Sequence, residues 1–310
     1  MKTAFVFPGQ GAQYIGMAAD FMQANPELLK VLDAFDQAHD TTLKQVMLEG
    51  PEESLKQTSY TQPAILFHSI AALSEFRKQS KVEPEFVAGH SLGEFSAMVA
   101  AKMLSFGDAL HLVHKRGEFM IKANAGVPFA MAAILGLDAE TVMMICEEAS
   151  QAGLVQAVNF NTPVQTVISG TAEGVAKAGE IAKTKGAKRV LPLIVGGPFH
   201  TPLIGQASSW LYEEMEKTTF HDGMFPVISN LDAAPCTDGM LQREKLARQI
   251  VSPVRWVACV EFMLAQGIGR FIEFGPQKVL SGMIKNIAKD AEVFSIDKME
   301  DIDAVVSMIK

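Results

Sequence analysis

The sequence predicts an α/β protein with a large domain and a smaller domain inserted into it. The apolar segment 86–88 precedes a short glycine-flanked turn, and apolar residues recur at helical spacing after Gly93, which is typical of a strand–turn–helix unit. Between 126 and 196 the predicted elements run in the order β-α-β-β-α-β, which is the ferredoxin-like order. We therefore expect a large domain of residues 1–125 and 197–310, and a small domain of residues 126–196.

A buried strand is predicted at residues 1–7, because this apolar run ends at Pro8 and Gly9. The glycine-rich turn that follows invites comparison with a dinucleotide-binding loop. That pattern, G-x-G-x-x-G, needs glycine at position 14, where Tyr14 stands, so we exclude a nucleotide site. Gln10 lies in this turn, at the carboxyl end of a strand, where α/β sheets collect their ligand contacts. The turn is either purely structural or brings Gln10 to a ligand.

Several helices are predicted over residues 17–80, including an apolar helix at 64–76. Ser105 and Asp108 fit a capping box, which predicts a helix that runs to about residue 124. The predicted small-domain strands are 129–135, 154–159, 165–169 and 189–195, its helices are 138–150 and 172–185, and further large-domain strands are 226–229 and 270–274.

Ser91 is the candidate nucleophile, because it lies between a predicted strand and a predicted helix. The run Gly89-His90-Ser91-Leu92-Gly93 fits G-x-S-x-G, in which small flanking residues allow a sharp turn that lifts the serine hydroxyl above the sheet edge. The amide of Leu92 would then lie at a helix N-terminus, where it can stabilise an oxyanion. A five-residue match also arises by chance, and the alternative is a turn without chemistry.

His200 is the candidate base among the seven histidines. It follows a predicted strand and precedes Thr201 and Pro202, which are expected to cap and to begin a helix. The other six are less suitable: His111 and His114 are predicted to face solvent, His39 and His221 lie in polar surroundings, His68 is expected in the core, and His90 diverges from its neighbour Ser91. No acidic residue follows a strand between Ser91 and His200 in the large domain. We therefore expect a Ser–His dyad whose imidazole is oriented by a backbone carbonyl.

Arg116 is the most informative charged residue of the chain. On the helix predicted after Ser105, it lies near the centre of an apolar arc that comprises Ala109, Leu112, Val113, Phe119 and Met120. A buried arginine needs an anionic partner, because leaving a buried charge unpaired costs about 3–5 kcal/mol. The two alternatives are an internal salt bridge to Asp or Glu, and a bidentate clamp for a substrate carboxylate.

Composition argues against several classes of protein. A net charge of −8 and a pI near 5.4 argue against general binding to nucleic acids or to anionic membranes. The three cysteines, Cys146, Cys236 and Cys259, form no C-x-x-C pair, so they suggest neither a disulfide framework nor a cysteine-based zinc site. No metal and no cofactor are expected. The short apolar N-terminus does not fit a signal peptide, and no segment reaches the length of a membrane span, so a cytoplasmic location is expected.

Seven segments together make the chain resemble the malonyl-CoA:acyl-carrier-protein transacylases of fatty-acid synthesis. They are 7–13 (Phe-Pro-Gly-Gln-Gly-Ala-Gln), 61–64 (Thr-Gln-Pro-Ala), 89–94 (Gly-His-Ser-Leu-Gly-Glu), 115–117 (Lys-Arg-Gly), 197–200 (Gly-Pro-Phe-His), 228–230 (Ile-Ser-Asn) and 274–276 (Phe-Gly-Pro). They follow one another over nearly the whole chain, and they are highly specific as a set.

The resemblance implies an α/β-hydrolase-like large domain with a ferredoxin-like insertion. It also implies the following roles: Ser91 as nucleophile, His200 as base, Gln10 and the Leu92 amide at the oxyanion site, Arg116 on the malonyl carboxylate, and the carbonyl of Gln249 as the group that orients the histidine. Phe199 would narrow the acyl pocket, although a role only in the core is the alternative. One departure is Gln277, which stands where the family more often has glycine.

The reaction implied by the resemblance is a ping-pong transfer through a malonyl-serine intermediate. Malonyl-CoA would donate the acyl group, and the phosphopantetheine thiol of holo acyl carrier protein would accept it. A monomer is expected. Three alternatives share parts of this prediction: a free-standing malonyl acyltransferase of a polyketide assembly line, an acyl-thioester hydrolase, and a non-catalytic module that binds a carrier protein.

Overall fold

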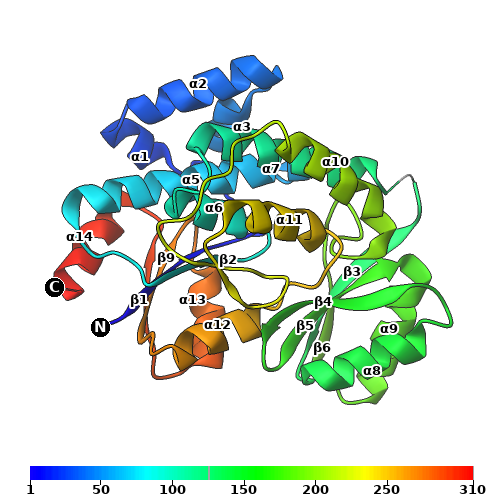
Figure 1. The fold of residues 1–310 in the computed structure, drawn as a ribbon. Helices are drawn as coiled ribbons and strands as arrows, with labels where there is room; N and C mark the ends of the chain where they lie inside the picture. The colour runs from blue at the N-terminus through cyan, green and yellow to red at the C-terminus, as the bar shows by residue number, and fades with distance from the viewer. Residues whose placement is uncertain (125, 310) are drawn as a thin grey trace.

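The computed structural model describes residues 1–124 and 126–309 and contains two β-sheets flanked by helices (Figure 1). The larger sheet has the order β10-β9-β1-β2-β7-β8. Its strands are β1 (Thr3–Phe7), β2 (Phe86–Gly89), β7 (Val227–Ile228), β8 (Pro235–Cys236), β9 (Arg270–Phe274) and β10 (Glu292–Ile296). Neighbouring strands are parallel from β10 to β7, and β8 runs antiparallel to β7. The predicted α/β class is confirmed.

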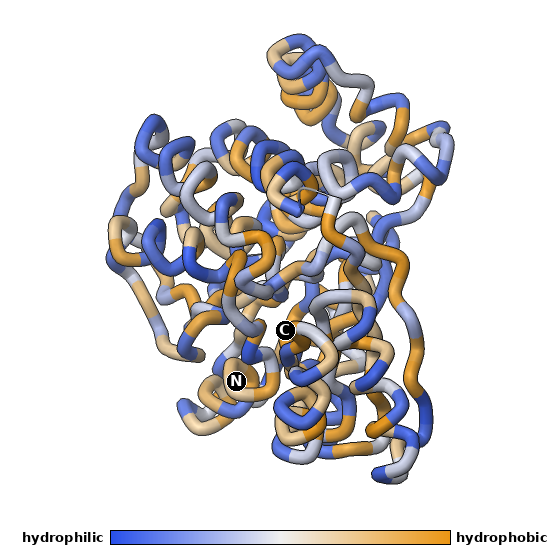
Figure 2. The backbone as a smooth tube through the Cα atoms, turned by 90° about the vertical axis from the view of Figure 1, so that its right-hand side faces the viewer, coloured by the Kyte–Doolittle hydropathy of each residue, from blue (hydrophilic) through white to orange (hydrophobic). Residues whose placement is uncertain are grey.

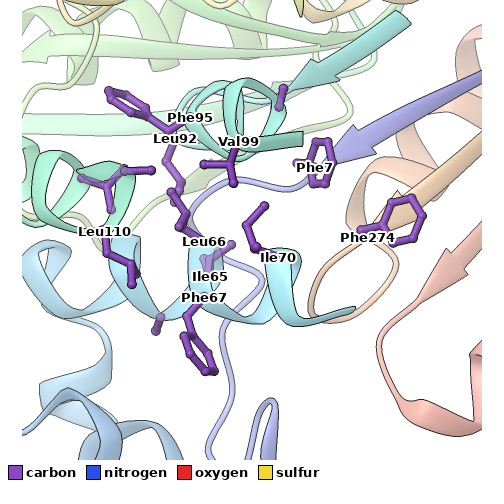
Figure 3. Close-up of a cluster of buried hydrophobic side chains, with 14 of the residues drawn as sticks. Phe7, Ile65, Leu66, Phe67, Ile70, Leu92, Phe95, Val99, Leu110 and Phe274 are labelled. Carbon is purple, nitrogen blue, oxygen red and sulfur yellow. The ribbon is translucent and has the colours of Figure 1, made fainter. Parts of the chain in front are cut away.

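Helices cover both faces of the larger sheet, so its strands are apolar on both sides. Phe5 and Phe7 of β1 join one core cluster, whereas the alternate residues Ala4 and Val6 join a second cluster. The first cluster packs against α5 (Thr58–Gln79), α6 (Gly93–Ala100) and α7 (Phe106–Lys122), and Figure 3 shows part of it. The second cluster packs against α12 (Trp256–Ala265) and α13 (Val279–Ile287).

The remaining helices of this part of the molecule lie around these two layers. They are α1 (Ala19–Ala24), α2 (Glu27–His39), α3 (Leu43–Glu49), α4 (Glu52–Leu55), the short 3₁₀ helix η1 (Pro202–Ile204), α10 (Gly205–Met215), α11 (Gly239–Gln249) and α14 (Met299–Met308). Hydrophilic and hydrophobic residues alternate along many of the helices (Figure 2), as expected where one face packs on a core. Within residues 1–124 and 126–309, no helix is long and apolar enough to cross a bilayer.

The smaller sheet is antiparallel and has the order β4-β5-β3-β6. Its strands are β3 (Phe129–Leu135), β4 (Val155–Thr162), β5 (Gln165–Thr171) and β6 (Arg189–Pro192). The helices α8 (Ala139–Ala149) and α9 (Ala172–Thr184) complete the predicted order β-α-β-β-α-β, and they lie side by side on one face of the sheet (Figure 1). The proposed domain limits at 126 and 196 stay a prediction.

Helix α5 begins at Thr58, six residues before the predicted start at residue 64. Pro63 lies inside it and has no N–H, so the carbonyl of Ser59 loses its helical hydrogen-bond donor. His114 of α7 fills that position, because its Nδ1 lies 3.0 Å from the Ser59 oxygen. The prediction that His114 faces solvent is therefore wrong: the side chain is buried where α7 packs against α5 and α2.

Ser105 and Thr201 were both predicted to cap helices, and only Ser105 does so. The Ser105 hydroxyl accepts a hydrogen bond from the Asp108 amide at 3.1 Å, which confirms the cap of α7. Thr201 precedes Pro202 at the start of η1, but its hydroxyl donates to the Pro198 carbonyl at 2.7 Å and does not cap the helix. The hydroxyl thereby closes the turn that contains His200.

Candidate active site

Ser91 lies in the turn between β2 and α6, and its backbone has a left-handed φ of 52°. The glycines on either side are needed because backbones approach closely there. A Cβ at Gly89 would lie 1.9 Å from the carbonyl carbon of Gly93, and a Cβ at Gly93 would lie 2.1 Å from the oxygen of Phe7. The G-x-S-x-G pattern thus reflects a turn packed against its own helix and against β1.

His200 meets Ser91 from a distant part of the chain. Its Nε2 lies 2.9 Å from the Ser91 Oγ. Its Nδ1 lies 2.9 Å from the Gln249 carbonyl and 3.1 Å from the Ser252 carbonyl. Because carbonyls only accept hydrogen bonds, Nδ1 carries the proton and Nε2 presents its lone pair to the serine hydroxyl. The contact with the Gln249 carbonyl agrees with what the resemblance implies, whereas the contact with the Ser252 carbonyl was not predicted.

Burial controls the charge of this imidazole. His200 is 3% exposed, and burial followed by the nearby Arg116 charge lowers the pKa of His200 to about 3. The hydrogen bond to the Gln249 carbonyl acts in the opposite direction on this pKa. The imidazole is therefore neutral at physiological pH and can accept a proton.

Arg116 is 1% exposed and reaches the same serine from α7. Its Nη2 donates to the Ser91 Oγ at 3.0 Å and to the Gln249 Oε1 at 3.0 Å, and its Nη1 donates to the Gln62 Oε1 at 2.9 Å. No carboxylate lies within 4.0 Å of this guanidinium among residues 1–124 and 126–309, so the internal salt bridge considered from the sequence is not formed there. Burial lowers the pKa of Arg116 to about 10, which leaves it charged near neutral pH.

These groups open onto a cavity of about 170 Å³ between the two sheets. Its large-domain wall includes Gln10, Leu92, Phe199 and the three residues described above, and its small-domain wall includes Met131, Asn159, Asn161 and Val167. A larger cavity, of about 730 Å³, lies between α8 and α12 and does not include Ser91 or His200. Of these two cavities, only the smaller one is lined by the serine, the imidazole and the guanidinium.

The other residues predicted for the site also border this cavity. Leu92 immediately precedes the first residue of α6, so its amide is at the helix N-terminus. The Gln10 side chain lies 3.5 Å from the Thr58 hydroxyl. Phe199 is 6% exposed and belongs to the large core cluster as well as to the cavity wall. The His90 side chain points away from Ser91, as expected, and its Nε2 lies 2.8 Å from the Asn161 Oδ1.

Asn230 and Glu94 were assigned no role from the sequence, although both lie in segments that carry the resemblance. Asn230 accepts a hydrogen bond from the Ser91 amide at 2.7 Å and donates to the Gly89 carbonyl at 2.8 Å, so it holds both ends of the turn. Glu94 is fully buried. Burial raises the pKa of Glu94, and the hydrogen bonds that it accepts oppose that rise. The sequence offered one indication that Asn230 and Glu94 belong to the site, namely that both lie in segments that carry the family resemblance.

Comparison with known proteins places the chain in a family. Residues 4–310 match the family model of the acyl transferase domain. The malonyl CoA-acyl carrier protein transacylase of Bacillus subtilis (strain 168) is 44% identical over 310 residues, which cover 100% of this chain and 98% of that protein. The protein of the same name from Escherichia coli (strain K12) is 41% identical over 307 residues and 99% of each chain.

Solved structures give the same result. The malonyl CoA-acyl carrier protein transacylase from Coxiella burnetii superposes with a TM-score of 0.95 at 38% identity, over 99% of this chain and 97% of that one. A structure described as a type II PKS acyl-carrier protein in complex with its malonyl-transacylase matches with a TM-score of 0.95 at 37% identity, over 99% and 100% of the two chains. This acyltransferase therefore belongs to the malonyl-CoA:acyl-carrier-protein transacylase family.

Proposed function

We propose that the protein transfers the malonyl group of malonyl-CoA to the phosphopantetheine thiol of acyl carrier protein, by a ping-pong mechanism through malonyl-Ser91. One observation carries this proposal. The Ser91 Oγ lies 2.9 Å from a neutral imidazole nitrogen and 3.0 Å from a buried guanidinium without a carboxylate partner among the described residues. A base and an anion-binding group thus converge on one nucleophile, as the transfer of an acidic acyl group requires.

In the first half-reaction, Ser91 passes its proton to the His200 Nε2 while its oxygen attacks the thioester carbonyl. The carbonyl oxygen becomes an oxyanion, and the Leu92 amide and Gln10 are its proposed donors. The carbonyls of Gln249 and Ser252 stabilise the imidazolium, because both accept from Nδ1. Collapse of the tetrahedral intermediate breaks the carbon–sulfur bond, and His200 returns the proton to the departing CoA sulfur.

In the second half-reaction, the phosphopantetheine thiol gives its proton to His200 and its sulfur attacks the malonyl-serine ester. The ester carbon–oxygen bond breaks, and the Ser91 oxygen recovers the proton from His200. Both half-reactions use the same base and oxyanion donors, so each acyl carrier reaches the serine through the same cavity.

Arg116 is the proposed selector of the acyl group. A malonyl carboxylate can pair with two N–H groups of the guanidinium, which orients the other end of the malonyl group over the serine. An acetyl group lacks that carboxylate and would leave the buried charge unpaired.

Fatty-acid synthesis is the proposed pathway, since the curated relatives described above are named for malonyl transfer to acyl carrier protein. A polyketide assembly line is the second candidate. It is favoured by the equally good structural match to a transacylase in complex with a type II PKS acyl-carrier protein. Rates of malonyl transfer to the two kinds of carrier, measured side by side, distinguish these pathways.

Intact-protein mass spectrometry tests the reaction. The protein mixed with malonyl-CoA is expected to gain the mass of one malonyl group, and holo acyl carrier protein is expected to remove it and gain the same mass. The Ser91→Ala variant forms no adduct. An adduct on Ser91→Ala would contradict the assignment of the nucleophile, and release of malonate as fast as transfer would favour the hydrolase.

A further inference from the structure

Glu94 is a fully buried carboxylate in the first turn of α6 that the proposed mechanism does not use. It accepts hydrogen bonds from the Asn230 amide at 2.9 Å, from the Gln249 Nε2 at 2.7 Å and from the Gln242 Nε2 at 2.5 Å. All three partners are donors, which is the arrangement that an ionised carboxylate requires, because it can only accept.

The side-chain amide of Gln249 has one orientation that fits its neighbours. Its nitrogen faces acceptors, namely Glu94 and the Ser91 carbonyl, the latter at 3.1 Å. Its oxygen accepts from the Arg116 Nη2 at 3.0 Å. A flipped amide would direct its oxygen at the carboxylate and its N–H groups at the guanidinium, which are both repulsive contacts.

The Gln249 side-chain amide therefore connects Arg116 to the carboxylate of Glu94, and the two charged groups form no direct ion pair. Glu94 is the acidic group whose charge acts on Arg116, yet no carboxylate lies within 4.0 Å of the guanidinium in the described part of the chain. A direct ion pair with a carboxylate would occupy two N–H groups of the guanidinium, which forms a fork of N–H donors. Here the Arg116 Nε has no hydrogen-bond partner among the described residues, and Nη2 points at the reacting hydroxyl.

We propose that Glu94 is a positioning residue for acyl-group selection: its carboxylate fixes the Gln249 amide, and the Gln249 oxygen holds the Arg116 guanidinium at Ser91 with part of its fork free. The inference rests on the proposed function, because it assigns Arg116 to the malonyl carboxylate. Glu94 acts through two other side chains and does not touch the acyl group.

The test is Glu94→Gln, which keeps the shape of the side chain and removes its charge. An amide offers one accepting oxygen and adds two N–H groups, so it cannot accept from all the donors that surround Glu94. The Gln249 amide is expected to rotate. The Arg116 guanidinium is then expected to move away from the Ser91 hydroxyl. The readout is the ratio of the rates of acyl-serine formation from malonyl-CoA and acetyl-CoA, followed by rapid quenching and intact mass. We expect this ratio to fall about tenfold or more.

A double-mutant cycle separates positioning from general damage to the fold. If Glu94 acts through Arg116, the substitution Glu94→Gln is expected to change the ratio by less than about twofold in an Arg116→Ala background. Glu273→Gln is the matched control. Glu273 is an equally buried carboxylate, on β9, that accepts from Leu280 and Ser281 at 2.6–2.9 Å and lies outside the cavity wall. Its substitution is expected to leave the ratio unchanged.

Three results would overturn the inference: an unchanged ratio in folded Glu94→Gln, an equal fall in Glu273→Gln, or a full effect of Glu94→Gln in the Arg116→Ala background. If Glu94→Gln does not fold, Gln249→Met decides instead. It removes the amide but keeps the backbone carbonyl that accepts from His200, and it is expected to lower the ratio similarly. Failure of the wild-type protein to form malonyl-serine would instead reject the proposed function.

Discussion

Ser91 and His200 both have left-handed backbones, with φ of 52° and 63°, and their side chains meet at 2.9 Å across 109 residues of sequence. This conformation costs a non-glycine residue about 1–3 kcal/mol, so the surrounding structure must impose it. Asn230 holds the Ser91 amide at 2.7 Å, and two carbonyls fix the His200 ring. The geometry of the dyad therefore depends on contacts formed only in the folded protein.

The pH dependence of acylation should report the Arg116 charge. That charge helps to lower the pKa of His200 by disfavouring the imidazolium, and the base must be neutral to accept the serine proton. In the Arg116→Ala variant the pKa of His200 is expected to rise. The acid limb of acetyl transfer, plotted as kcat/KM against pH, should then move to higher pH.

Arg116→Lys is the control for this pH profile, because it keeps the positive charge and removes the fork. Its acid limb is expected to stay close to that of the wild type. The same upward displacement in both variants would show that loss of the guanidinium hydrogen bonds, and not loss of charge, changes the base.

Arg116→Ala should also abolish the preference for an acidic acyl group. Removing one partner of a buried charge pair costs about 3–5 kcal/mol, so the ratio of kcat/KM for malonyl-CoA over acetyl-CoA is expected to fall by at least about a hundredfold. Lys115→Ala is the matched control, since Lys115 is the residue before Arg116 on α7 and pairs with Glu118 at the surface. Equal losses on both substrates would indicate a structural role for Arg116.

Local patterns predicted most of the elements, because apolar periodicity and turn residues act over short distances. The strand predicted at 129–135 coincides with β3, and the helix predicted at 172–185 is α9 within one residue. The two-residue strand β8 and the edge strand β10 were not predicted. β8 is too short for any alternation. In β10, Glu292 and Ser295 interrupt the apolar residues, and most of the strand is only half-buried.

The residues of the candidate site also fall into those that a local pattern predicts and those that it does not. Ser91 and Arg116 were recognisable because a tight turn and a helical arc are local signals. The hydrogen bonds from the Gln249 Nε2 to Glu94 and from the Ser91 amide to the Asn230 Oδ1 span 155 and 139 residues, and no local pattern encodes them. Gln277 has a left-handed φ of 63°, a conformation that favours glycine, which is the residue that the resemblance implies at this position.

Gly89→Ala should disrupt the turn that carries Ser91, the proposed nucleophile. The added Cβ would lie 1.9 Å from the backbone of Gly93 and 2.4 Å from the Glu94 nitrogen, and backbone on both sides cannot easily move. We expect a loss of about 3 kcal/mol or more in the free energy of unfolding, measured by chemical denaturation. Gly282→Ala is the control, because a Cβ there meets nothing within 4 Å, and alanine in an exposed helix gains up to about 1 kcal/mol. A Gly89→Ala variant as stable as the wild type would contradict this account of the motif.

Phe199→Ser should widen the proposed acyl pocket beside His200. The ring lines the cavity and packs in the core, so its loss should both make room for an α-methyl group and destabilise the fold. A methyl group is worth about 1–3 kcal/mol in such a pocket, which predicts at least a tenfold rise in the methylmalonyl-to-malonyl ratio of kcat/KM. Phe35→Ser is the control, because Phe35 is similarly buried, in the same core cluster, but outside the cavity wall. It should lose stability and keep the wild-type ratio. If Phe199→Ser also keeps that ratio, Phe199 serves the core alone.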